Sequence, residues 1–185
     1  MNLVIHKGKP TDTSGRLQKE IRVYEYLDNL GIEYYRIDHD LCPSMKDLEE
    51  INAIFKNIIC KNLLLCNTQR TKFYLLMMPK DKRFYTKIVS KLIGSSRLSF
   101  AEDIYLEKYL DVTPGSVSIM GLMNDKENVV QLIIDSDVIK NEYIGCHPCI
   151  NTSSLKILTK DILEKFLVSV NHKPIIIDIP NDENN

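Results

Sequence analysis

The chain has 185 residues, of which 44% are hydrophobic and 26% charged, and its formal net charge is −1. This length and composition predict one globular domain with a sizeable core, residues 1–185, and argue against a second domain. The near-neutral charge excludes a strong overall field that would attract nucleic acid.

The apolar runs of the chain are short. A run such as residues 74–79 falls far below the roughly 20 apolar residues that cross a bilayer. The first residues carry charges where a signal peptide would have its apolar stretch. We therefore expect a cytoplasmic protein with no membrane partner, and a frayed tail at residues 180–185.

The first half of the chain mixes helical and extended patterns. Apolar residues at helical spacing, with Gly31 just beyond the last of them, are typical of a complete amphipathic helix. In chain order we expect a helix between Ser14 and Gly31, a strand at 33–38, a helix from Pro43 to about Ala53, and a hairpin of strands 58–66 and 72–79 joined by the turn 67–70.

The second half continues the mixture. Ser99 and Glu102 have the spacing of a capping box, and Thr159 is a candidate cap for the last helix. We expect a helix bearing the stripe Phe84, Ile88 and Leu92, a helix at 100–110, a short extended piece at 116–118, strands at 129–134, 143–147 and 155–158, a helix from 159 to 170, and a strand at 174–177. About seven strands and five helices without regular alternation indicate a mixed α/β (α+β) fold.

Five cysteines raise the question of a thiol or metal site, because Cys146 and Cys149 frame the sequence C-H-P-C. A redox pair of this spacing needs its first cysteine at a helix N-terminus, whereas a strand is expected to follow here. A zinc site needs about four ligands, usually two such pairs. We therefore interpret the cysteines as small buried hydrophobic residues.

Three other places stand out. Lys61 begins an otherwise apolar strand, where it lies either at the rim of the sheet or in a pocket. Two glycines bracket the segment from Pro114 to Gly121, and glycine lets backbone N–H groups approach a ligand closely. His147 precedes a proline, which indicates a stiff loop.

Four motifs in order resemble one known family: KNLLL at 61–65, RLSFA at 97–101, PGSVS at 114–118 followed by Gly121-Leu122, and HPCINTSSL at 147–155. The resemblance is to the free-standing relatives of the bacterial prolyl-tRNA synthetase editing domain, in the YbaK-like superfamily, and to their PrdX or ProX branch of alanyl-tRNA(Pro) deacylases. It covers roughly residues 15–177. It implies a single domain whose mixed, largely antiparallel and curved sheet is flanked by helices.

The resemblance also implies an activity, the hydrolysis in trans of tRNA(Pro) mischarged with alanine. The reaction would be assisted by the terminal ribose hydroxyl and would need no metal or other cofactor. The implied partner is the acceptor end of tRNA(Pro), with prolyl-tRNA synthetase as a further candidate. The implied catalytic residues are Lys61, Gly115 and His147, and the implied substrate-binding residues are Asn62, Ser116, Val117, Ser118, Ile119, Pro148, Asn151 and Thr152.

Two points stay open at this level. Many relatives have a proline where this chain has Ile119, so a non-catalytic tRNA- or amino-acid-binding module, or a sibling deacylase for cysteine or serine, remains an alternative, as does a thiol enzyme. The run from Lys80 to Arg97 is strongly basic, which most often marks a solvated helix face. Because an acceptor stem needs phosphate contacts, we hypothesise that Lys82, Lys87, Lys91 and Arg97 touch tRNA.

Overall fold

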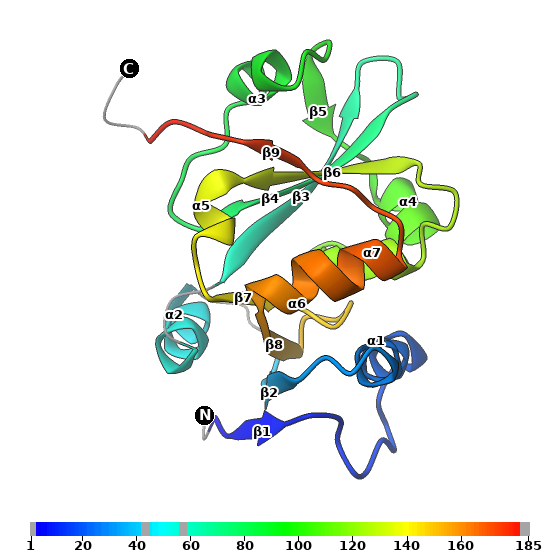
Figure 1. Cartoon of the computed structure of the whole chain (residues 1–185), viewed down its shortest axis with the longest axis vertical. Coiled ribbons are helices and arrows are strands. Elements are labelled where there is room, and N and C mark those ends of the chain that lie inside the picture. Colours follow the sequence, from blue (N-terminus) through cyan, green and yellow to red (C-terminus); the bar gives the residue numbers. More distant parts are fainter. Residues whose placement is uncertain (1–2, 42–44, 56–58, 182–185) are drawn as a thin grey trace.

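The computed structural model describes residues 3–41, 45–55 and 59–181 (Figure 1). Its strands are β1 (Ile5–Lys7), β2 (Tyr34–Asp38), β3 (Cys60–Asn67), β4 (Phe73–Pro79), β5 (Leu98–Phe100), β6 (Val130–Asp135), β7 (Tyr143–Cys146), β8 (Ser153–Leu158) and β9 (Ile175–Ile177). Its α-helices are α1 (Gln18–Asn29), α2 (Met45–Ile54), α3 (Thr86–Leu92), α4 (Asp103–Tyr105), α5 (Ser136–Ile139), α6 (Thr159–Asp161) and α7 (Leu167–Ser169). π-Helical turns extend α4 over Leu106–Leu110 and join α6 to α7 over Ile162–Phe166, and a 3₁₀ helix spans Ile119–Met123.

The strands form two sheets. One is antiparallel throughout, in the order β1-β2-β8-β7. The other has the order β5-β3-β4-β6-β9, in which β5, β3 and β4 are antiparallel while β4, β6 and β9 run parallel. The mixed fold is therefore as expected, but the described residues hold nine strands in two sheets where about seven in one sheet were expected.

The central strands of the five-stranded sheet are covered on both faces. One face meets the largest apolar cluster, which includes Leu64, Leu75 and, from other elements, Tyr24 and Phe166. The opposite face, with Leu65 and Leu76, packs under α3. Since neighbouring residues of a strand point to opposite faces, burial of both faces explains the unbroken apolar runs of β3 and β4.

Two predicted helix starts are wrong. Ser99 belongs to β5, where it pairs with Cys66 of β3, so it cannot cap a helix, and α4 begins after Glu102 without a side-chain cap. Thr159 is already the first residue of α6, and its hydroxyl donates to the carbonyl of Asn141 at 2.5 Å. In both cases a partner distant in sequence takes the side chain that the local pattern assigned to a cap.

Other expectations are confirmed, and a few elements were missed. The hairpin of β3 and β4 forms as predicted, and Gly31, with φ of +62°, follows the end of α1. The short elements β1, β5 and α5 were not foreseen. Pro43 and Ser44, the expected start of α2, and most of the expected tail lie outside the described residues. Within the described ranges, no helix combines the length and apolar character that crossing a membrane requires.

The C-H-P-C cysteines are core residues. Cys146, at 5% exposure, ends β7, and Cys149, at 0%, lies in the loop that follows. Burial raises the pKa of the Cys149 thiol to about 12 and also raises the pKa of Cys146. Because the thiolate is the reactive form, these cysteines lack the character of a redox or nucleophilic pair, as predicted from the sequence.

We predict that Cys146 and Cys149 resist alkylation in the native protein. At pH 9 a thiol with a pKa of about 12 has a thiolate fraction several hundred-fold lower than an ordinary thiol. Iodoacetamide labelling followed by peptide mass spectrometry should leave both residues unmodified at pH 9 and modify both in denaturant, with a model peptide thiol as the reference. Rapid labelling of either residue in the native state would restore the thiol-enzyme alternative.

Candidate active site at the open edge of strand β3

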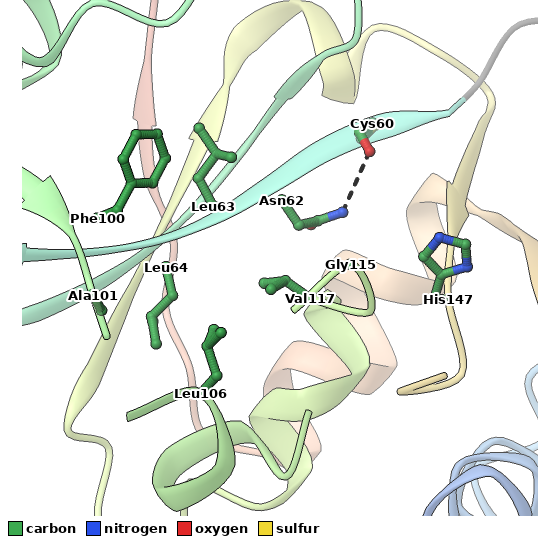
Figure 2. Close-up of a pocket in the computed structure, with 10 residues that line it drawn as sticks. All are labelled: Cys60, Asn62, Leu63, Leu64, Phe100, Ala101, Leu106, Gly115, Val117 and His147. Atoms are coloured by element: carbon green, nitrogen blue, oxygen red, sulfur yellow. Dashed lines mark hydrogen bonds between the residues drawn. The ribbon is translucent and has the colours of Figure 1, made fainter. Parts of the chain in front are cut away.

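A cavity of about 370 Å³ lies beside the first half of β3. Figure 2 shows its wall, to which β3, the end of β5, the Gly115 loop and the loop after β7 all contribute. The lining residues are Cys60, Asn62, Leu63, Leu64, Phe100, Ala101, Leu106, Gly115, Val117 and His147.

The register of the sheet leaves this edge open. β5 pairs with β3 only from Leu65 to Asn67, after which the Ala101 N–H donates to the Leu64 carbonyl at 2.9 Å. The earlier residues of β3 pair with β4 on their other side. The cavity therefore occupies the place where a longer β5 would have continued the sheet.

Gly115 lies in a tight turn that only a glycine accommodates without strain. Ser116 closes the turn, because its N–H and its hydroxyl both donate to the Thr113 carbonyl, at 3.0 and 2.9 Å. Gly115 has φ of +85°, and a Cβ placed there would lie 3.3 Å from Nδ2 of Asn151. The turn thus needs glycine both for its backbone conformation and for its close approach to the second loop.

A buried hydrogen bond joins the two loops. The hydroxyl of Ser118, which is 0% exposed, donates to the carbonyl of His147 at 2.5 Å. The same oxygen accepts from the N–H of Met120 and so caps the 3₁₀ helix. Ser118 therefore fixes the backbone of His147 relative to the Gly115 turn.

The ring of His147 is held in one tautomer. Nδ1 donates to the Ser153 carbonyl at 2.8 Å, which leaves Nε2 as the acceptor of a neutral ring. Burial lowers the pKa of His147, the Ser153 carbonyl opposes this shift, and His39, whose ring centre is 6.2 Å away, lowers the pKa further. At neutral pH the imidazole is uncharged, and it lines the cavity.

A polar network supports Ser153 from behind. The hydroxyl of Ser153 lies 3.2 Å from that of Tyr24, which donates to the buried carboxylate of Glu20 at 2.7 Å. Glu20 in turn receives a charge-assisted hydrogen bond from Arg16 at 2.5 Å, and Arg16 also holds Asp38. The position of His147 therefore rests on a chain of satisfied buried groups rather than on a mobile loop.

Lys61 and Asn62 point to opposite faces of β3. The ammonium of Lys61 donates to the carbonyl of Lys82 at 2.6 Å, and Lys61 is not among the cavity-lining residues. Asn62 does line the cavity, and its Oδ1 is buried without a hydrogen-bond partner in the described part of the chain. The structure thus brings Asn62, Gly115, Val117 and His147 together, with the Lys61 side chain turned away.

The other expected substrate-binding residues are not among those that line the cavity. Ser116, Ser118, Ile119 and Pro148 are buried, and Ile119 belongs to the main apolar cluster. Asn151 packs against Gly115, and the Thr152 carbonyl accepts from the His39 N–H at 2.9 Å. These residues shape the two loops without lining the cavity.

One of the four expected tRNA contacts is wrong. Lys82 is 8% exposed, and its ammonium binds Asp135 at 3.0 Å, Asp137 at 2.7 Å and the Ile179 carbonyl at 2.7 Å. Burial alone would lower the pKa of Lys82, but the two aspartates outweigh it and raise that pKa. Lys87, Lys91 and Arg97 are exposed, as a tRNA contact requires.

Sequence reasoning missed most of the apolar wall. Phe100, Ala101 and Leu106 were all assigned to a helix at 100–110, although the RLSFA motif contains the first two. No grouping of three or more histidine, cysteine, aspartate or glutamate side chains that would suit a metal ion occurs within residues 3–41, 45–55 and 59–181.

Comparison with known proteins identifies the family. Residues 39–165 match the family model described as aminoacyl-tRNA editing domain. The prolyl-tRNA editing protein ProX of Acetoanaerobium sticklandii is 33% identical over 141 residues, which cover 76% of this chain and 85% of that protein. Prolyl-tRNA synthetase associated domain-containing protein 1 of Danio rerio is 28% identical over 163 residues, which cover 87% of this chain and 86% of that protein.

Solved structures share the fold. A crystal structure described as a candidate trans-editing enzyme for prolyl-tRNA synthetase superposes with a TM-score of 0.65, over 89% of this chain and 99% of that one. At 13% identity this likeness shows the fold alone. The match of the family model over most of the sequence shows that the chain belongs to the aminoacyl-tRNA editing domain family.

Proposed function

We propose that the chain hydrolyses, in trans, the ester of alanyl-tRNA(Pro). As a member of the editing family it is an aminoacyl-tRNA hydrolase by class, and its relative ProX is a prolyl-tRNA editing protein. The observation that supports the proposal most is the cavity in which Asn62 faces two loops that Ser118 ties together. The amino acid removed and the assisted mechanism below are parts of the proposal.

The proposed chemistry requires few groups. An aminoacyl ester is already activated, so hydrolysis needs a positioned water and a stabilised oxyanion. Gly115 and Val117 line the cavity, and their backbone N–H groups have no hydrogen-bond partner among the described residues, so they are available to the oxyanion. Nε2 of neutral His147 accepts a hydrogen bond from the water or from the neighbouring ribose hydroxyl, which assists the attack.

Selectivity for alanine rests on the size and rigidity of the cavity. Leu64, Leu106 and Val117 give it an apolar wall, and the Ser118 hydrogen bond limits its expansion. An apolar pocket discriminates by only about 1–3 kcal/mol per methylene when the smaller group merely loses contacts. Steric exclusion of the proline ring by a wall that cannot yield is the stronger effect, and it would protect correctly charged tRNA(Pro).

Ile119 does not count against catalysis. It is 0% exposed and begins the 3₁₀ helix, outside the set of cavity-lining residues. Replacement of the family's usual proline therefore alters the packing behind the Gly115 turn. Ser116 and Ser118 supply the rigidity of that turn through their own hydrogen bonds.

The decisive experiment follows ester loss from alanyl-, prolyl- and cysteinyl-tRNA(Pro). We expect alanyl-tRNA(Pro) to be hydrolysed at least about tenfold faster than the other two, because a tight apolar pocket rejects larger groups. His147→Ala should lower kcat by about 100-fold through lost positioning, whereas His6→Ala, at an exposed histidine of β1, should leave it unchanged. Faster loss of cysteine would indicate the sibling deacylase, and no loss from any substrate would indicate a binding module.

We keep Lys61 in the proposal as a cation that leaves the carbonyl of Lys82 and binds the substrate instead. To reach the substrate it must release the Lys82 carbonyl, a hydrogen bond with a net worth of about 0.5–1.5 kcal/mol. Lys61→Ala should therefore abolish measurable turnover while changing the free energy of unfolding by less than about 1.5 kcal/mol. Lys160→Ala, at an exposed lysine of α6, is the control. Full activity of Lys61→Ala would leave Asn62 as the polar side chain that β3 contributes.

The exposed basic residues are proposed to contact the acceptor stem. Replacing Lys87, Lys91 and Arg97 together by glutamate should raise KM and flatten the dependence of log KM on log salt by about one unit per lost phosphate contact. Lys160→Glu, on a different element, should leave that slope unchanged. An unaltered slope in the triple variant would show that tRNA approaches from another side.

A further inference from the structure

Phe100 is an exposed aromatic ring at the rim of the cavity. Its exposed fraction is 61%, large for a phenylalanine, and yet it belongs to the cavity wall. Because Phe100 pairs with Leu65, its ring lies on the Leu63 side of β3, and Figure 2 shows Asn62, Val117 and His147 on the other side of that strand. A ligand that crosses the open edge of β3 would therefore meet the ring on one side of the strand and the imidazole on the other.

The fold holds this ring in place. Phe100 ends β5, the edge strand of the five-stranded sheet, and it pairs with Leu65 of β3. Phe84, just before α3, packs against it at 5.5 Å between ring centres, with 61° between the ring planes. Such an edge contact fixes the orientation of the ring and leaves most of its surface in solvent.

Three exposed basic residues lie on α3 and just before β5, on the elements next to Phe100. Figure 1 shows α3 beside β5, and the hydroxyl of Ser90 on α3 accepts from the N–H of Leu98 on β5 at 3.1 Å. Lys87 and Lys91 of α3 and Arg97 before β5 are exposed. These cations would attract the phosphates of a polyanionic chain toward the exposed ring of Phe100.

We propose that Phe100 is the stacking platform for the 3′-terminal nucleobase of the substrate. This inference rests on the proposed function, since the aminoacyl ester is carried by the ribose of that nucleoside. With the base on Phe100, the ribose and ester extend toward Gly115 and His147, and the preceding phosphates face the basic residues. Stacking on an aromatic ring is tolerant of base identity, so the platform positions the substrate while the cavity selects the amino acid.

A fluorescence titration tests the platform without requiring catalysis. The chain contains no tryptophan, so Phe100→Trp creates a single reporter that still stacks. Its emission should be quenched saturably by the trinucleotide CCA, and far less by the same trinucleotide with an abasic 3′ end. Val168→Trp, at a residue of α7 with 69% exposure, is the control and should show no saturable quenching. Equal response of Phe100→Trp to the two probes overturns the proposal.

Steady-state kinetics with alanyl-tRNA(Pro) provide a second test of the Phe100 platform. Phe100→Ala should raise KM by about 5- to 150-fold, the range that loss of one base–aromatic stack produces, with a much smaller change in kcat. Phe100→Tyr should restore KM, because it keeps the ring. An unchanged KM in Phe100→Ala, with an active wild type, overturns the platform and leaves the proposed function standing. Base-dependent quenching with an inactive wild type supports the platform and refutes the proposed function.

Discussion

The hydrogen bond from the Ser118 hydroxyl to the His147 carbonyl is the contact on which the candidate site depends. It joins the Gly115 turn to the loop between β7 and β8, which belongs to the other sheet. Because Ser118 is buried, water does not compete for this bond, and breaking it would leave a polar group unsatisfied. The bond therefore connects the two loops that contribute Gly115, Val117 and His147 to the cavity.

The Ser118 bond is effective because the groups behind it are also fixed. Ser153 orients His147 through its carbonyl and reaches Tyr24 through its hydroxyl, and Tyr24 lies on α1 against Glu20. A buried carboxylate is unfavourable unless it is paired, and Arg16 provides the pair. The network thus connects α1 to the ring of His147, which lines the candidate site.

The sequence predicts those elements whose apolar residues recur in a regular local pattern. Residues 18–29 bury an apolar stripe on one side, and β3 and β4 are long apolar runs around a polar turn, so these elements were found. β5 has only three residues and is defined by its pairing with the edge of β3. A local sequence pattern does not reveal such a pairing, so β5 was not predicted. Of the candidate site, the glycine turn and the H-P loop follow from motifs, but the face to which Lys61 turns depends on where the carbonyl of Lys82 lies.

Lys82 shows most clearly why the other features of the site could not be predicted from the sequence. In sequence it belongs to a basic run, yet its partners Asp135 and Ile179 are 53 and 97 residues away, and they make it a buried anchor. That anchor also presents the carbonyl that holds the Lys61 ammonium. The segment after β9, the β6 carboxylate and the beginning of β3 are thereby connected through one residue. Loss of the Lys82 ion pairs would release Lys61 as well as the C-terminal segment, so an effect of Lys82 on activity would arise through the fold and not through contact with tRNA.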